Sequence, residues 1–236
     1  MLREELIKLS PIRVLEKSIN GGLGKGNLGV FTARKGVGKT ATLVHVAVDK
    51  LLRNNKVIHL SFSDNPRHIE IWYDHVFNEI AKAYNLENIL DNQEQIIKNR
   101  LIINLNKKST DPQEIESVIK KCMDGAKFYP AMFIVDGFSF YDRERDDFLF
   151  WKKFAEQHNA EIWFSATLHR HSLEFDDQGI PSPASNFKDL FSVIIMLEPK
   201  ENHISLKLLK DHDNPQVDQL KLKLNPKTML IANHRV

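Results

Sequence analysis

Short apolar runs alternate with longer segments of helical periodicity over most of the 236 residues. Apolar runs of about four to eight residues are typical of buried strands, and apolar positions three or four residues apart indicate helices. The pattern predicts strands at 28–33, 56–63, 101–104, 131–137 and 160–166. It predicts helices at 2–9, 39–52, 66–84, 112–123 and 146–158. This alternation indicates an α/β fold, in which a mostly parallel central sheet carries helices on both faces.

The last third of the chain has a different pattern, because strands follow one another there through short connections. These strands are predicted at 192–198, 203–210, 218–224 and 228–232. Short connections favour antiparallel pairing, so we expect all four to be added antiparallel at one edge of the sheet. The polar segment 169–186 is predicted to be a mobile loop, and 1–19 to be a lead-in segment. No linker composition divides the chain, so we expect a single domain, 1–236.

Composition narrows the classes of protein to which the chain can belong. Lys+Arg number 33 and Asp+Glu 31, a net charge of +2 that makes DNA a less favoured partner. Cys122 is the only cysteine, which excludes an intrachain disulfide and fits a reducing compartment. The charged N-terminus is unlike a signal peptide, and no apolar run approaches the ~18 residues of a membrane span. We therefore expect a cytoplasmic protein with no membrane partner.

The segment "ARKGVGKT" at 33–40 has the pattern of a phosphate-binding loop and stands between a predicted strand and a predicted helix. Its glycines let the backbone wrap phosphates with N–H groups, and the helix directs its positive end at them. Lys39 is placed to reach the β- and γ-phosphates, and the Thr40 hydroxyl to bind Mg²⁺. We predict phosphate binding at Ala33, Arg34, Lys35, Gly36, Val37, Gly38, Lys39, Thr40 and Ala41.

A second acidic residue follows an apolar strand, at the end of "FIVD". A carboxylate at a strand end is the usual partner of a phosphate loop, and it holds Mg²⁺ through water. The alternative is a strand that ends in a turn-forming Asp-Gly pair. Given the loop, we favour the functional interpretation and predict a Mg²⁺ site between Thr40 and Asp136.

The stretch "GGLGKGNLGVFTARKGVGKTATLV" at 21–44 resembles the entry to the RecA-like ATPase core, especially its KaiC-like and DnaB-like branches. The resemblance extends over about 10–232 and is most specific at the phosphate loop. It implies a RecA-like P-loop fold with ATP and Mg²⁺ as cofactors. It also implies a homo-oligomer, a ring or filament with active sites between subunits.

The same resemblance indicates where catalytic groups should stand, and several of them differ here. Relatives carry a glutamate base just after the second strand, where this chain has Ser63 and then Asp64. Thr167 stands near a position that is often glutamine. A lysine and an arginine that reach a neighbour's site correspond to Lys210 and His212. Serine is no base at neutral pH, and imidazole replaces a permanently charged guanidinium poorly.

These differences lead to three hypotheses. The first is an ATP-binding switch or assembly factor whose hydrolysis is weak or depends on a partner. The second is an active DNA-dependent ATPase of the DnaB or recombinase type, with Asp64 as base and Lys210 acting on a neighbouring subunit. The third is a nucleotide-free scaffold of the same fold. We favour the first, because the groups that hold phosphate and metal are present while those that drive hydrolysis are altered.

Two other groups of residues have functional interpretations that we do not favour. A metal site in the loop after residue 168 would lack any standard zinc spacing. Its candidate ligands are His169, His171, Asp176 and Asp177.

Three aromatic residues at helical spacing are better explained as a core face than as a platform for bases. They are Trp72, Tyr73 and Phe77. We also expect His45 to be a hydrogen-bonded core residue.

Overall fold

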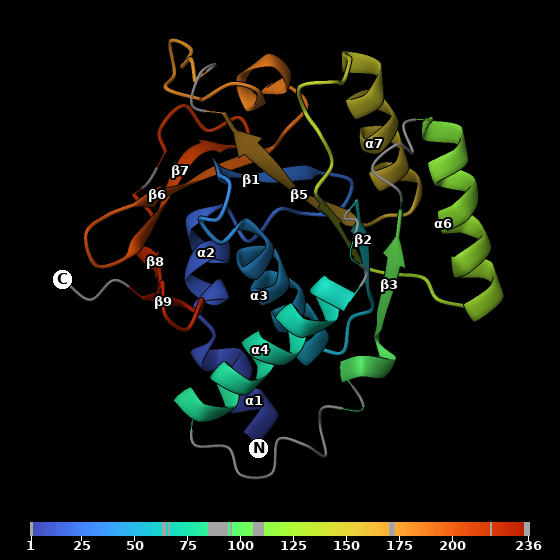
Figure 1. The fold of residues 1–236 in the computed structure, drawn as a ribbon, viewed down its shortest axis with the longest axis horizontal. Helices are drawn as coiled ribbons and strands as arrows, with labels where there is room; N and C mark the ends of the chain where they lie inside the picture. The colour runs from blue at the N-terminus through green and yellow to red at the C-terminus, as the bar shows by residue number, and fades with distance from the viewer. Residues whose placement is uncertain are drawn as a thin grey trace.

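Figure 1 shows the fold in a computed structural model, which describes residues 2–62, 65, 67–84, 94, 96–105, 111–169, 173–217 and 219–233. The helices are α1 (Leu2–Leu9), α2 (Ile12–Ser18), α3 (Lys39–Leu52), α4 (Arg67–Ala83), α6 (Pro112–Ala126), α7 (Arg145–Gln157) and the 3₁₀ helix η2 (Ala184–Phe187). The strands are β1 (Leu28–Arg34), β2 (Val57–Ser61), β3 (Arg100–Asn104), β4 (Met132–Asp136), β5 (Glu161–Leu168), β6 (Val193–Pro199), β7 (Ile204–Asp211), β8 (Leu222–Leu224) and β9 (Ile231–Asn233).

Within the described residues, the strands form one nine-stranded sheet in the order β3-β2-β4-β5-β1-β6-β7-β8-β9. The six strands from β3 to β6 in this order pair in parallel. The last three are antiparallel to their neighbours. The predicted α/β fold is therefore confirmed, with a mostly parallel sheet and antiparallel strands at its C-terminal edge.

The direction of β6 corrects the sequence prediction, which made all four late strands antiparallel. β6 pairs in parallel with β1, with Gly29 opposite Val193. The chain leaves the carboxyl end of β5 and returns through residues 169–192 to the other end of the sheet. Such a crossover needs a dozen or more residues, and this segment is long enough to supply it. The antiparallel part therefore begins only at β7.

The segment predicted to be a mobile loop supplies much of this crossover, and its described part packs on the sheet. Ile180 and Ala184 are fully buried. The Asp176 carboxylate accepts hydrogen bonds from the backbone N–H of Ile180 and from the Lys188 ammonium. Residues 170–172 lie outside the described part of the chain, so mobility in this segment stays a prediction.

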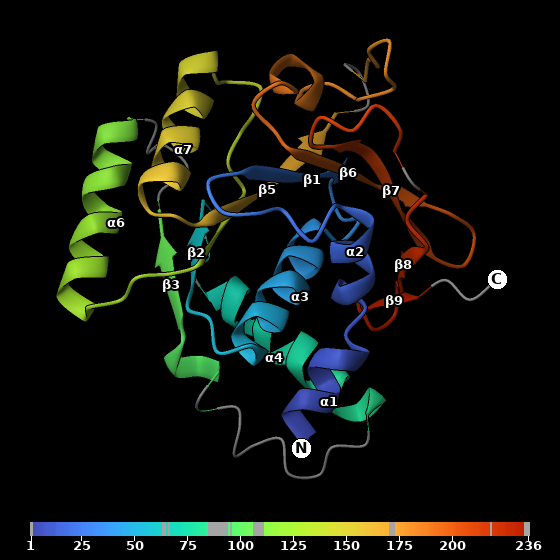
Figure 2. The same ribbon diagram turned by 180° about the vertical axis from the view of Figure 1, so that it is seen from behind.

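Helices cover both faces of the sheet, as Figures 1 and 2 show from opposite sides. One apolar core lies between the sheet and α1–α4, and it includes Leu43, Val46 and Ile134. The other lies between the sheet and α6 and α7, and it includes Phe148 and Ile119. The lead-in segment, residues 1–19, forms two helices where we predicted one. After α1 ends at Leu9, α2 begins directly after Pro11. Proline at such a position favours the start of a new helix.

α3 is the most deeply placed helix of the first face and lies against β1, β4 and β5. The sequence predicted its bounds and its burial, because apolar residues occupy most of its faces. Its N-terminus meets the carboxyl end of β1, which lies inside the sheet. Strand, turn and helix thus place residues 34–40 at the edge where the parallel strands end.

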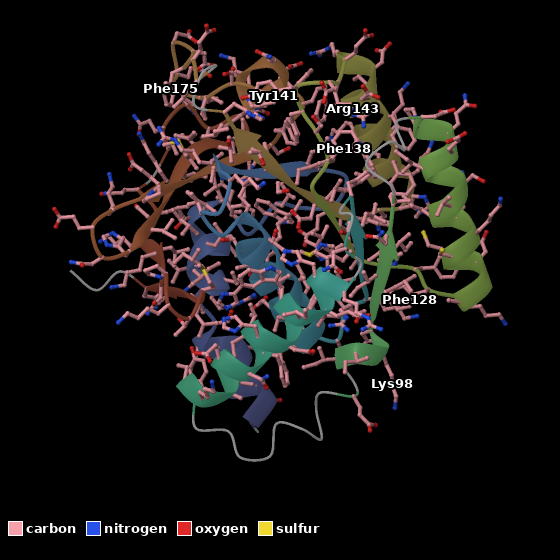
Figure 3. All side chains as sticks on the ribbon, viewed as in Figure 1. Lys98, Phe128, Phe138, Tyr141, Arg143 and Phe175 are labelled. Carbon is pink, nitrogen blue, oxygen red and sulfur yellow. The ribbon has the colours of Figure 1, made fainter. Side chains whose placement is uncertain are left out.

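Local sequence explains where the helices of the second face begin. Asp111 caps α6 by accepting a hydrogen bond from the Gln113 N–H, and Pro112 follows it. Glu144 and Asp147 form a capping box at the start of α7. Between β4 and α7, the Arg143 guanidinium lies 4.4 Å from the centre of the Phe138 ring (Figure 3).

Candidate functional site

The predicted phosphate loop links β1 to α3 at the carboxyl edge of the sheet. Gly36 and Gly38 both have positive φ, +82° and +108°. A side chain at Gly36 would meet nothing within 4 Å, whereas a Cβ at Gly38 would lie 2.6 Å from the Leu224 Cδ2. No side chain caps the first turn of α3. The loop therefore has open space at its tip and a helix N-terminus with backbone donors at its base.

Lys39 bends back across the loop. Its ammonium donates to the carbonyl oxygens of Ala33, at 3.0 Å, and Arg34, at 3.1 Å. The side chain is buried, and this desolvation lowers the pKa of Lys39 to about 8, although the nearby Asp136 opposes the shift. Burial of a charge without a full set of partners is costly, so an anion beside this ammonium would stabilise it.

Thr40 and Asp136 meet, although 96 residues separate them. The Thr40 hydroxyl donates to the Asp136 Oδ2 at 2.8 Å. Both side chains offer oxygen atoms, which are the donors that Mg²⁺ prefers, and one or two protein ligands suit an ion that keeps water and phosphate in its shell. The two residues that the sequence predicted as metal ligands are therefore adjacent and chemically suited to Mg²⁺.

Ser165 orients the carboxylate of Asp136, a role that the sequence pattern did not predict. Its hydroxyl donates to the Asp136 Oδ1 at 2.6 Å and accepts a hydrogen bond from the Gly137 N–H at 3.1 Å. The Ser165 side chain is buried on β5, the strand between β4 and β1. A small polar residue in the otherwise apolar run "IWFSA" was the available signal.

A second serine stands beside the acid on its other side. Ser61 ends β2 and lies directly opposite Asp136 in the register. Its hydroxyl is buried and has no hydrogen-bond partner among the described residues. Asp64, the predicted catalytic base, and Ser63 follow this serine, but both lie outside the described residues. Their roles stay predictions.

Thr167 lies at the loop, next to Ala33 in the pairing of β5 with β1. The structure therefore places Thr167, which the resemblance put near a glutamine position, beside the predicted phosphate loop. Arg34 and Lys35, in the loop itself, have exposed side chains. Basic side chains in this position add positive charge around the site.

Lys210 is not at the loop within its own chain. Lys210 pairs with Ile194 of β6, and Ile194 pairs with Val30 of β1, so Lys210 lies two strands away from β1. In that register Lys210 is level with Val30, about three residues before Ala33 and the loop. Its ammonium donates to the carbonyl oxygens of Lys188 and Phe191, each at 2.7 Å. Lys210 therefore holds the crossover segment to β7. Its predicted action on a neighbouring subunit would require these bonds to break.

His212 is also engaged inside the chain. Its Nδ1 lies 2.8 Å from the Asp211 Oδ1, and its Nε2 lies 3.1 Å from the Leu23 carbonyl oxygen. Asn20 donates to the other oxygen of Asp211 at 3.0 Å. These contacts attach the glycine-rich turn before β1 to the end of β7. His212 therefore has a structural role within the chain.

The remaining candidates are core or surface residues. Tyr73 and Phe77 are buried, which confirms the core interpretation for both. His45 is buried and accepts a hydrogen bond from the Ile231 N–H at 3.0 Å, as expected of a core histidine. In the loop, His171 lies outside the described residues. Across the part of the chain that the structure describes, no group of three or more acidic, histidine or cysteine residues is arranged to hold a metal ion.

Comparison with known proteins adds no family: no protein-family model matches the chain, and no curated protein matches it either. None of the described helices is long and apolar enough to cross a membrane.

Proposed function

We propose that the protein binds ATP with Mg²⁺ as a RecA/KaiC-like P-loop protein, and that its ATP hydrolysis is weak or depends on a partner. In this proposal it acts as a switch or assembly factor rather than a motor, because the nucleotide is bound but hydrolysed slowly. The observation that carries the proposal is the hydrogen bond from Thr40 to Asp136 at the foot of the phosphate loop.

The described geometry supports nucleotide binding in three ways. The loop backbone and the first turn of α3 offer N–H groups to phosphate oxygens. The Lys39 ammonium lies across the loop and is buried enough to gain from an anion. Thr40 and Asp136 would hold Mg²⁺, which supplies charge neutralisation of the phosphates when it is bound. Ser165 keeps the carboxylate in place for this role.

Slow hydrolysis rests on the residues that stand where catalytic groups are expected. Lys210 and His212, which the family resemblance makes candidates for action across a subunit interface, are both bonded within the chain. An arginine finger can contribute on the order of 10³ to 10⁵ in rate. A histidine in its place that is hydrogen-bonded within the chain should therefore leave ATP hydrolysis much slower. Thr167 also lacks the amide of the glutamine that relatives place there.

A titration of the purified protein with ATP and Mg²⁺ tests the proposal. We expect saturable binding that Lys39→Ala weakens at least tenfold, while Lys121→Ala, which removes an exposed charge on α6, leaves it unchanged. Turnover should be negligible with and without single-stranded DNA. Turnover that DNA stimulates would favour the DNA-dependent ATPase, and failure to bind ATP at millimolar concentration would favour the nucleotide-free scaffold.

The catalytic base has its own test. Ser63→Glu restores a carboxylate at the position where relatives carry the base, so turnover should rise if the base alone is missing. Asp64→Asn removes the only acid of this segment that the sequence offers as a base. Any turnover that survives Asp64→Asn unchanged would exclude Asp64 from this role.

A further inference from the structure

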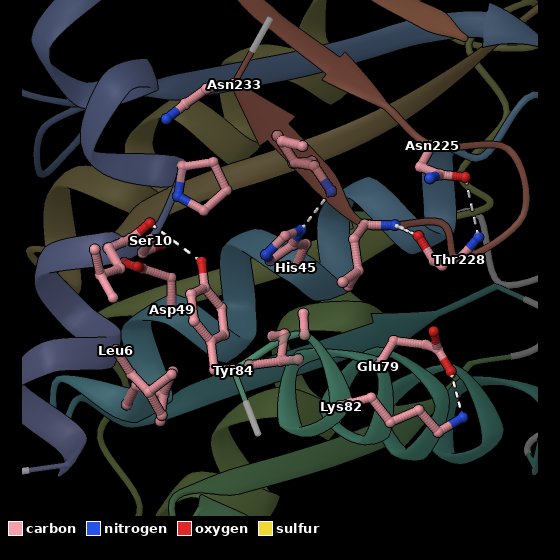
Figure 4. Close-up of a pocket in the computed structure, with 18 of the residues that line it drawn as sticks. Leu6, Ser10, His45, Asp49, Glu79, Lys82, Tyr84, Asn225, Thr228 and Asn233 are labelled. Carbon is pink, nitrogen blue, oxygen red and sulfur yellow. Dashed lines mark hydrogen bonds and ion pairs between the residues drawn. The ribbon is translucent and has the colours of Figure 1, made fainter. Parts of the chain in front are cut away.

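A cavity of about 670 Å³ lies on the α1–α4 face, away from the phosphate loop (Figure 4). Its walls come from α1, α3, the end of α4 and the β8–β9 hairpin. Leu6, Leu52, Ile80 and Leu230 give it apolar sides. A volume of roughly 300–1,000 Å³ with mostly apolar walls is typical of sites for small molecules.

A buried histidine with a free N–H faces this cavity. His45 is 4% exposed and lines the cavity from the middle of α3. Its Nδ1 accepts the hydrogen bond from the Ile231 N–H, so the proton of the neutral ring is on Nε2. Burial lowers the pKa of His45 to about 4, which keeps the ring neutral at pH 7. Nε2 has no hydrogen-bond partner among the described residues, and in Figure 4 this side of the ring points into the cavity.

Three of the four charged residues that line the cavity are paired, and the fourth is Lys223, on β8. Glu79 and Lys82 form an ion pair with each other at 2.6 Å. The Asp49 carboxylate, buried beside His45, is held by Arg13 and by Arg53. Among the buried side chains of its lining, the cavity offers apolar surface and one neutral N–H donor, that of His45. A ligand that is itself neutral and carries one acceptor oxygen matches both.

We propose that this cavity is a second binding site, which takes a neutral, mostly apolar small molecule and receives its carbonyl or hydroxyl oxygen at the His45 Nε2–H. The site shares α3 with the phosphate loop but none of the loop's residues. It is therefore separate from the proposed ATP site and stands whether or not ATP binds.

The test uses 6-propionyl-2-(dimethylamino)naphthalene, a neutral fluorophore with one ketone, whose emission moves to shorter wavelength in apolar surroundings. Titration of the full chain should give a saturable shift with one site. Ala83→Trp places a large ring at the exposed end of α4 that lines the cavity, and should weaken binding at least tenfold. Asn78→Trp, which places the same ring at an exposed position of α4 outside the cavity, should leave fluorophore binding within about twofold.

His45→Asn tests the donor, because an asparagine can still accept from the Ile231 N–H but does not reach as far into the cavity. Loss of one hydrogen bond should weaken the fluorophore roughly two- to tenfold. Lys39→Ala should leave fluorophore binding unchanged, which separates this site from the ATP site. Absence of a saturable shift in the unaltered protein, or equal binding by the Ala83→Trp and Asn78→Trp variants, would overturn the proposal.

Discussion

Lys39 carries its charge where burial opposes it, so its protonation should control the binding of an anion. An anion favours the charged form, which means that affinity falls as pH rises through the pKa of about 8 in the free protein. Between about pH 7.5 and about pH 9.5, ATP should bind up to roughly 20-fold more weakly. Titration calorimetry at these two values measures the change.

Lys39→Arg is the matched control, because a guanidinium stays charged throughout this range. The variant should bind ATP with an affinity that hardly depends on pH. If the unaltered protein showed no pH dependence either, Lys39 would not face the phosphates in the complex.

Two buried histidines should make the protein sensitive to acid. Burial lowers the pKa of His45 and of His59 to about 4, below the ordinary value of 6.5. The unfolded chain then binds protons that the folded chain does not, so stability is complete above about pH 6.5 and is lost as pH falls towards 4. Each histidine should cost roughly 2 kcal/mol between pH 7 and pH 5.

Urea unfolding at both pH values measures this loss of the free energy of unfolding. In His45→Asn the loss of the free energy of unfolding between the two pH values should be smaller by roughly 2 kcal/mol, the contribution of His45. An identical loss in the variant and the unaltered protein would assign the acid sensitivity to other groups.

At the scale of elements, the loop at 33–40 packs against the β8–β9 hairpin at Gly38. Gly38→Ala forces a residue with a side chain into a positive φ and against the buried Leu224, so it should lower stability by about 2–4 kcal/mol. Gly36→Ala has the same backbone strain but open space, and should cost only about 1 kcal/mol. Chemical denaturation of both variants gives the comparison.

A double-mutant cycle identifies the partner in this contact. Leu224→Ala makes room for the new methyl group, so the costs of Gly38→Ala and Leu224→Ala should not add. Additive costs would mean that backbone strain alone accounts for the effect at Gly38.

The elements themselves were largely predictable. The spacing of apolar residues located α3 and the strands of the parallel sheet. This is possible because that spacing shows whether one face or both faces of a helix or strand will be buried. The direction of β6 was not predictable, because an apolar run looks the same whether its strand pairs in parallel or antiparallel. Only the length and path of the crossover before Val193 decide which pairing forms.

At the scale of the whole molecule, Lys210 joins the sheet to the crossover segment. Lys210→Met keeps most of the apolar stem but leaves the carbonyl oxygens of Lys188 and Phe191 without their donor. We expect a loss of about 1–2 kcal/mol in the free energy of unfolding, with ATP affinity unchanged. Thermal unfolding and an ATP titration of the same sample measure both. Lower ATP affinity at full stability would instead support action across a subunit interface.

The sequence by itself determined the α/β class, and it predicted the phosphate loop at 33–40 and the two oxygen ligands for Mg²⁺. These depend on local periodicity and on the spacing of a few residue types. Only the tertiary structure decided that Thr40 meets Asp136, that Ser165 orients this carboxylate, and that Lys210 and His212 are bonded within the chain. It also formed the cavity beside His45. Such contacts join distant parts of the chain, and strand register and packing fix them, which local pattern does not encode.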